Sequence, residues 1–335
     1  MKKKISTYVL LIMCLFSCEE IFVGSDPPNT YATNFELLWK DFDQNYPSFI
    51  IKKIDWESIY QQSSSEIEFI NNDREFFDLL SKITLNFKDG HVALIGRFGD
   101  IRYIRSNGIT ENTPNNIQNY VSNIKNSNQA ISYGDINGNN FGYIRVKTFS
   151  SFLSPSYFEV IDEILTIFSN KRGIILDLRS NDGGASVNAN TIASRFINNS
   201  SCAIKLKYRN GPNHNDLTEG IKIFIESEGV SYTKPIAILT NRRTASASEY
   251  FTQSLMDYSN VTIVGDTTSG SLGNSVWREL PNGWTYRMTI NLAETCNNVS
   301  YEDIGIPPDV PIWISKQDSI NGIDTILEKA ISILE

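Results

Sequence analysis

Apolar residues recur at three- and four-residue intervals in three stretches of the first ninety residues, and this spacing predicts three amphipathic helices. The first stretch covers residues 35–46 and is ended by Pro47, a residue that breaks helices. The second covers residues 55–67 and the third covers residues 72–83. We therefore expect a small helical N-terminal subdomain over residues 34–90.

Beyond residue 90 the pattern changes to short apolar runs that alternate with amphipathic segments. This alternation predicts an α/β domain with a largely parallel sheet over residues 91–335. The turn Pro281-Asn282-Gly283 also predicts a β-hairpin between two apolar segments, whereas the Asn-rich residues 100–140 favour loops around one or two strands. The expected strands are 92–95, 141–146, 173–178, 203–208, 235–240 and 261–265, and the expected helices are 155–168, 186–197, 249–258 and 326–334.

The N-terminus has the pattern of a bacterial lipoprotein signal. Three lysines precede an apolar run that is too short to span a bilayer and that ends just before Cys18. We expect residues 1–17 to be a signal peptide, Cys18 to be the lipidated first residue, and residues 18–33 to be a polar tether. The alternative is an uncleaved anchor. Both interpretations place the chain in the cell envelope. We expect it to be anchored to the outer membrane, on the periplasmic or the surface face.

Charge and cysteine content exclude some classes of function. The formal net charge is −8, and loss of the three signal lysines takes it to −11, so we expect no nucleic-acid partner. The chain has only two histidines and no CxxC spacing, so we expect no metal site. Cys202 and Cys296 either form a disulfide or remain two buried thiols.

Four short strings carry candidate chemistry, and each also has an ordinary structural explanation. The small-residue run 244–249 either caps a helix or holds a nucleophilic serine, and the paired glycines in 177–184 either make a turn or bind an oxyanion. His91, in the string 88–91, is either a structural residue or a general base. The acidic string 301–309 either solvates a loop or orients the histidine.

Together and in this order, these strings resemble the C-terminal processing (tail-specific) peptidase family. The resemblance rests on Asp177 to Gly184 (DLRSNDGG), Thr244 to Glu249 (TASASE), Gly265 to Gly270 (GDTTSG) and Gly305 to Asp309 (GIPPD). It implies that Ser246 is the nucleophile. It also implies that the N–H of Ala247, with that of Gly183 or Gly184, forms the oxyanion hole.

The chain departs from the bacterial branch of that family at one decisive position. Ser271 stands where those enzymes carry the lysine that acts as base, so a Ser-Lys dyad is absent. The tricorn-core branch instead uses a histidine and a late glutamate, which match His91 and Glu302. A serine precedes that histidine in the tricorn branch, whereas Gly90 precedes it here, and this puts the fourth member of the catalytic set in doubt.

The resemblance implies a β-β-α superhelix of the Clp protease/crotonase type behind the helical subdomain. Many members of the family insert a PDZ domain between these two parts, but only 85 residues separate His91 from Asp177 here, and residues 141–168 are expected to be core strand and helix. We therefore expect no PDZ domain. The resemblance also implies a serine-type endopeptidase that hydrolyses peptides or unfolded protein tails without a metal or a cofactor. The main alternative is a non-catalytic lipoprotein on the same fold that binds an apolar ligand or a peptide. A third class, a surface adhesion or nutrient-capture lipoprotein, draws support only from the anchor and from Glu19-Glu20.

Overall fold

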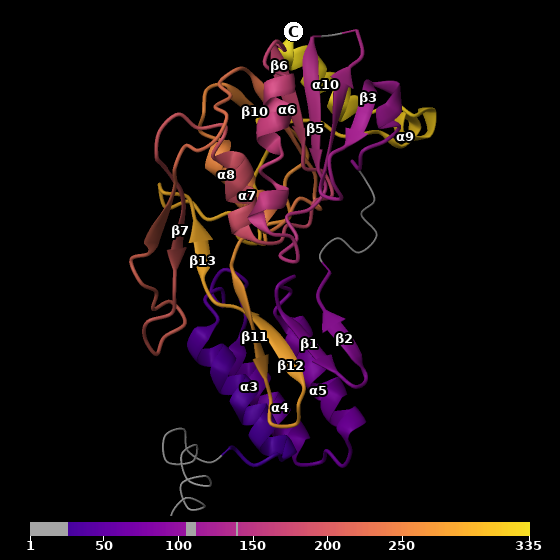
Figure 1. Cartoon of the computed structure of the whole chain (residues 1–335). Coiled ribbons are helices and arrows are strands. Elements are labelled where there is room, and N and C mark those ends of the chain that lie inside the picture. The colour runs from indigo at the N-terminus through magenta and orange to yellow at the C-terminus, as the bar shows by residue number, and fades with distance from the viewer. Residues whose placement is uncertain (1–25, 105–111, 139) are drawn as a thin grey trace, which may run out of the picture.

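The computed structural model describes residues 26–104, 112–138 and 140–335. Its elements form two lobes, one built around three helices and the other around a seven-stranded sheet (Figure 1). The expected signal peptide and Cys18 lie outside the described residues. Within those residues no helix is long and apolar enough to cross a membrane.

The helical lobe packs three helices against a four-stranded sheet of order β11-β12-β1-β2. Its core is rich in aromatic side chains, including Phe42, Trp56 and Phe87, which pack around one another. Thr30, Asp55 and Asn72 cap the three helices, as expected for polar residues before an apolar stripe. The elements are α3 (Tyr31–Asn45), α4 (Trp56–Ile67), α5 (Asp73–Asn86), β1 (Ala93–Gly96), β2 (Gly99–Arg102), β11 (Ser275–Glu279) and β12 (Thr285–Thr289).

The predicted domain limits need two corrections. The first helix begins at Tyr31, inside the segment expected to be a tether. The helical lobe also does not end at residue 90, because β1 pairs with β12 and Leu94 lies opposite Tyr286. Figure 1 shows the orange hairpin β11-β12 among the indigo and purple helices. The helices bury their apolar faces on this hairpin, so residues 275–289 complete the N-terminal lobe.

The second lobe contains a mixed sheet of order β14-β10-β9-β6-β5-β4-β3, in which the strands from β5 to β14 are parallel. Helices α6, α7 and α8 pack on one face and α10 packs on the other. This agrees with the predicted α/β fold class. The elements are β3 (Val121–Asn126), β4 (Ile131–Ile136), β5 (Phe141–Val146), α6 (Ile161–Ile167), β6 (Gly173–Asp177), α7 (Ser186–Ala193), β9 (Ile236–Thr240), α8 (Ala247–Leu255), β10 (Val261–Gly265), β14 (Val310–Pro311), α9 (Lys316–Asn321) and α10 (Thr325–Leu334).

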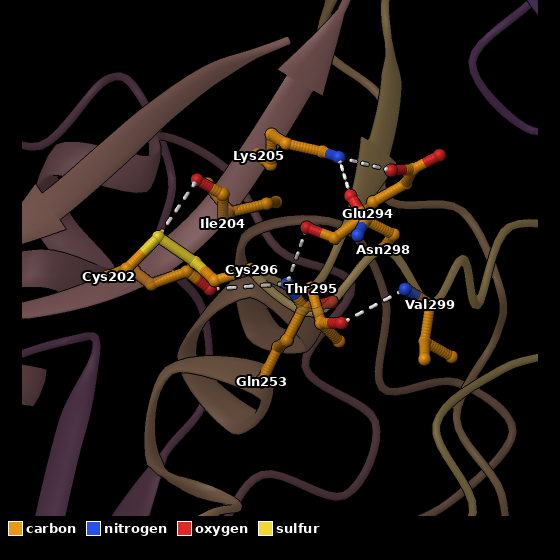
Figure 2. The surroundings of a disulfide bond; sticks show 10 residues. Cys202, Ile204, Lys205, Gln253, Glu294, Thr295, Cys296, Asn298 and Val299 are labelled. Carbon is orange, nitrogen blue, oxygen red and sulfur yellow. Dashed lines mark hydrogen bonds and ion pairs between the residues drawn. A yellow bond between two sulfur atoms is a disulfide. The ribbon is translucent and has the colours of Figure 1, made fainter. Parts of the chain in front are cut away.

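A small third sheet of order β13-β7-β8 lies beside α8. Its strands are β7 (Ser201–Lys207), β8 (Ile221–Ile225) and β13 (Leu292–Glu294). Cys202 and Cys296, whose pairing the sequence left open, form a disulfide that ties β7 to the segment after β13 (Figure 2). Gln253 of α8 donates to the carbonyls of Ala203 and Glu294, so the sheet is held against the helix. The disulfide and these hydrogen bonds hold β7 and β8 in place, and the two strands form one wall of a cavity beside α8.

Candidate active site

Ser246 lies at the turn between β9 and α8, where the small-residue run predicts a nucleophile. Its backbone is in an unusual conformation for a serine, with φ 55° and ψ −120°. The turn is held by the Ser246 N–H, which lies 3.1 Å from both the Ser271 carbonyl and a Glu249 carboxylate oxygen. A strained backbone fixed in this way marks a position under functional constraint.

Glu249 is the buried anchor of this turn. Its carboxylate also accepts hydrogen bonds from the Gly270 N–H at 2.6 Å, the Ser271 N–H at 2.9 Å and the Thr268 hydroxyl at 2.6 Å. Burial raises its pKa, and these hydrogen bonds oppose that rise. Glu249 therefore locks the segment 268–271 onto the start of α8. The sequence supplied this glutamate as part of a motif but gave no sign of its structural role.

His91 meets Ser246 across the junction of the two lobes. Its Nε2 lies 3.2 Å from the Ser246 Oγ. The turn that carries it is fixed by Arg287 of β12, which donates to the carbonyls of Gly90 and His91 at 2.7 and 2.8 Å. Burial lowers the pKa of His91, Asp89 opposes this, and the charges of Arg287 and Lys52 lower it further. The imidazole is therefore neutral near pH 7 and able to accept a proton.

Glu302, the expected third member, is buried nearby but is bonded elsewhere. Its carboxylate accepts the Leu272 N–H at 3.0 Å and lies 3.8 Å from the Lys52 Nζ. Burial, with a contribution from Asp89, raises its pKa to about 8. Across the described part of the chain it makes no hydrogen bond to His91, whose Nδ1 has no partner there. Glu302 therefore lies in the site without orienting the imidazole directly.

Lys52 is a site residue that the sequence analysis missed. It lies in the turn between α3 and α4, and its side chain is only 4% exposed. Its Nζ is 3.1 Å from an Asp303 oxygen and 3.4 Å from the Lys88 carbonyl. It thus links the turn before His91 to the loop that carries Glu302. No local pattern distinguishes this lysine from an ordinary surface lysine.

The double-glycine turn packs directly against the candidate nucleophile. A Cβ atom on Gly183 would lie 2.7 Å from the Ser246 Cβ and 2.8 Å from the Ala247 nitrogen. The Gly183 N–H donates to the Asn181 Oδ1 at 3.0 Å, so it is already occupied. The N–H groups of Gly184 and Ala247 have no hydrogen-bond acceptor among the residues placed by the structure. Of the two expected arrangements, Ala247 with Gly184 is the one that leaves both donors available.

A cavity of about 250 Å³ opens beside Ser246. Its walls come from α7, α8 and the strands β7 and β8, and most of the side chains that line it are apolar. They include Val187, Ile204, Leu206, Ile223, Phe224 and Leu272. Gly184, Ser246 and Ala247 also line the cavity. A bound side chain would therefore lie next to the hydroxyl and the two available N–H groups.

Gly90 has room for the side chain that the tricorn branch carries at this position. A Cβ atom there would lie 3.7 Å from the Ser271 Oγ and 3.9 Å from the Tyr103 carbonyl oxygen, both ordinary contacts. The chain thus places Ser271 beside the position of the missing serine.

Among the described residues, no group of three His, Cys, Asp or Glu side chains could hold a metal ion.

Comparisons with known proteins identify the family and the fold of the chain. The family model for peptidase family S41 matches residues 140–312, and that for the tricorn protease C1 domain matches residues 27–84. A crystal structure of a candidate peptidase from Parabacteroides merdae ATCC 43184 is 30% identical, with a TM-score of 0.80, over 92% of this chain and 97% of that one. The photosystem II D1 C-terminal processing protease shares the fold, with 15% identity and a TM-score of 0.57 over 90% of this chain and 98% of that one.

The carboxy-terminal processing protease CtpA of Bacillus subtilis (strain 168) is 29% identical over 178 residues. The match covers 53% of this chain and 36% of CtpA, so the chain spans about a third of the length of the curated relatives it matches. No PDZ domain is present in the described parts of the chain, and the predicted fold class is confirmed. The chain belongs to peptidase family S41.

Proposed function

We propose that this protein is a serine peptidase in which Ser246 is the nucleophile and His91 is the general base. The observation that carries the proposal is the 3.2 Å contact between the His91 Nε2 and the Ser246 Oγ, beside two unpartnered N–H groups. Nucleophile and base within hydrogen-bond reach are the arrangement that acyl transfer requires. Family membership supports the same reaction class.

The proposed reaction follows from the positions of these groups. The His91 Nε2 accepts the proton of the Ser246 hydroxyl as the Oγ attacks a peptide carbonyl carbon, and the N–H groups of Ala247 and Gly184 stabilise the oxyanion. His91 then donates this proton to the leaving amine, so the peptide C–N bond breaks and an acyl-enzyme remains. A water molecule hydrolyses the acyl-enzyme by the same route. Each oxyanion donor contributes roughly 3 kcal/mol to lowering the barrier.

The substrate in this proposal is a peptide or an unfolded protein tail that places an apolar side chain in the cavity. The support is the apolar lining made by β7 and β8 and its position next to Ser246. Cleavage as an endopeptidase, and attachment to the cell envelope through a lipid on Cys18, are parts of the same proposal. The lipobox-like sequence before Cys18 supports the anchor.

A fluorophosphonate probe, which reacts covalently with an activated serine, tests the assignment. We expect rapid labelling of the wild type, none of Ser246→Ala, and a loss of at least tenfold in rate for His91→Ala. Ser248→Ala is the matched control, because it changes a second serine at the start of the same helix. Labelling that persists in Ser246→Ala would overturn the nucleophile assignment, and no labelling of the wild type would favour the non-catalytic alternative.

A further inference from the structure

Asp89 is a buried carboxylate two residues before His91 that takes no part in the proton transfers described above. It is 1% exposed. One oxygen accepts the His91 backbone N–H at 2.8 Å, and the other accepts the Tyr46 hydroxyl at 2.9 Å and the Thr289 hydroxyl at 3.0 Å. The donors come from the turn before β1, the end of α3 and the end of β12, so three segments hold this carboxylate in place.

These contacts keep Asp89 ionised inside the protein. Burial alone would raise its pKa, but the charges of Lys52 and His91 and the hydrogen bonds to the carboxylate lower it below the ordinary value. Glu302 is different, because its pKa of about 8 leaves it largely protonated at pH 7. Asp89 is therefore the carboxylate beside His91 that carries a full negative charge at neutral pH.

Two cationic side chains near His91 also affect the charge of its imidazole. Arg287, bonded to the His91 carbonyl, and Lys52, bonded to the Lys88 carbonyl, both oppose a positive charge on the imidazole. Asp89 is the group that favours that charge. Proton transfer from Ser246 produces an imidazolium, so the site needs an anion to offset burial and these two cations.

We propose that Asp89 is the positioning residue of this site, fixing the His91 backbone through its N–H and supplying the negative charge that stabilises the protonated imidazole. This inference rests on the proposed function, because it concerns how His91 serves as base. It assigns to Asp89 the electrostatic support that the resemblance predicted for Glu302. Glu302 instead accepts the Leu272 N–H, as described above.

The first test is a histidine titration followed by NMR in a ¹⁵N-histidine-labelled Ser246→Ala protein. With only His91 and His214 in the chain, the spectrum contains two imidazoles, and the second is an internal control. Asp89→Asn removes the charge but keeps an acceptor for the His91 N–H. We expect it to lower the pKa of His91 by about one unit. The matched control is Asp43→Asn, which removes the negative charge beside His214 and should leave His91 unchanged.

The second test separates the charge from the hydrogen bonds by the rate of fluorophosphonate labelling as a function of pH. Asp89→Asn should lower the plateau rate at least tenfold and move the acid limb to lower pH. Tyr46→Phe removes one hydrogen bond from Asp89 but leaves its charge, so the plateau should fall much less. If Asp89→Asn does not fold, the double variant Thr289→Val with Tyr46→Phe removes both hydroxyl hydrogen bonds from Asp89 and so raises the pKa of Asp89. We then expect the pKa of His91 to fall, by less than in Asp89→Asn.

Three results would overturn this role for Asp89. The titration of His91 could be unchanged in Asp89→Asn, the labelling profile could match that of the wild type, or Tyr46→Phe could lower the plateau as much as Asp89→Asn does. The NMR titration does not depend on activity. If the wild type fails to react with the probe, the proposed function fails, while the titration still decides whether Asp89 controls the charge of His91.

Discussion

At the scale of single residues, the protonation state of His91 sets the pH range in which Ser246 can be activated. Burial, Arg287 and Lys52 together lower the pKa of His91 below 6.5 even though Asp89 opposes them. A protonated imidazole cannot accept the serine proton, so reactivity is lost as pH falls through this pKa. We expect the acid limb of the labelling rate to have its midpoint below pH 6.5. A midpoint above 7 would contradict the described environment of His91.

The raised pKa of Glu302 predicts how the folding stability depends on pH. Its pKa is about 8 in the folded protein, above the ordinary value of 4.5, so the folded state binds the proton more tightly than the unfolded chain. This contribution is present at low pH and is lost as pH rises towards 8. Glu302→Gln, which cannot ionise, should therefore gain stability relative to the wild type by about 1 kcal/mol per pH unit between pH 5 and 8.

Urea unfolding at several pH values measures this difference. Glu57→Gln, a change at an exposed glutamate of α4, is the control and should show a difference from the wild type that hardly varies with pH. A Glu302→Gln curve parallel to that of the wild type over the same pH range would show that Glu302 is ionised throughout. The raised pKa would then be wrong.

At the scale of elements, the double-glycine turn and the start of α8 act as one unit. Gly183 has φ +94°, and an added Cβ would lie 2.6 Å from the Ala245 carbonyl oxygen. We expect Gly183→Ala to cost about 1–3 kcal/mol of stability and to reduce labelling at least tenfold, because the backbone around Ser246 must shift. Gly283→Ala is the control, since it has φ +80° but open space around the added Cβ. Unimpaired labelling in Gly183→Ala would contradict this coupling.

How well the sequence predicted each element depended on how buried that element is. The strands β5 and β10, in which all but one residue each is buried, were predicted with their observed bounds. The bounds of β3, within the Asn-rich residues 100–140, were not predicted. It is an edge strand with five exposed residues, and its apolar residues do not alternate with polar ones. The helix expected over 155–168 is broken into a 3-10 turn, Pro155–Tyr157, and α6. Such breaks depend on packing against neighbours, which a local pattern does not contain.

Some residues of the site were predictable from the sequence and others were not. The strings that contain Ser246, His91 and the paired glycines are motifs within single turns, and the fold brings them together. Lys52 and the hydroxyl of Tyr46 were not predictable, because each reaches the site through contacts with segments distant in the sequence. Lys52 contacts Glu302 and Asp303 of the other lobe, and Tyr46 bonds to Asp89 within its own lobe. Tyr46 was expected only as an apolar face residue. Contacts made between distant segments leave no periodic signal in the chain.

At the scale of the whole molecule, the candidate site exists only where the two lobes meet. His91 is held by Arg287 of the hairpin β11-β12, whereas Ser246 is held by Glu249 of the second lobe. A second connection lies after β7, where Arg209 donates to the Asp43 and Tyr46 carbonyls and His214 contacts Asp43. The 3.2 Å contact between base and nucleophile therefore depends on the docking of the lobes.

Cleavage of an unfolded protein is the measurement that tests the central claim most directly. Purified wild-type protein and the Ser246→Ala variant would each be incubated with a reduced, carboxymethylated protein, and the fragments would be identified by mass spectrometry. We predict that the wild type releases fragments, that apolar residues are enriched at the cleaved bonds, and that Ser246→Ala releases none. Equal fragment release by both proteins, or none by a folded wild type, would contradict the proposal that Ser246 acts as a peptidase nucleophile.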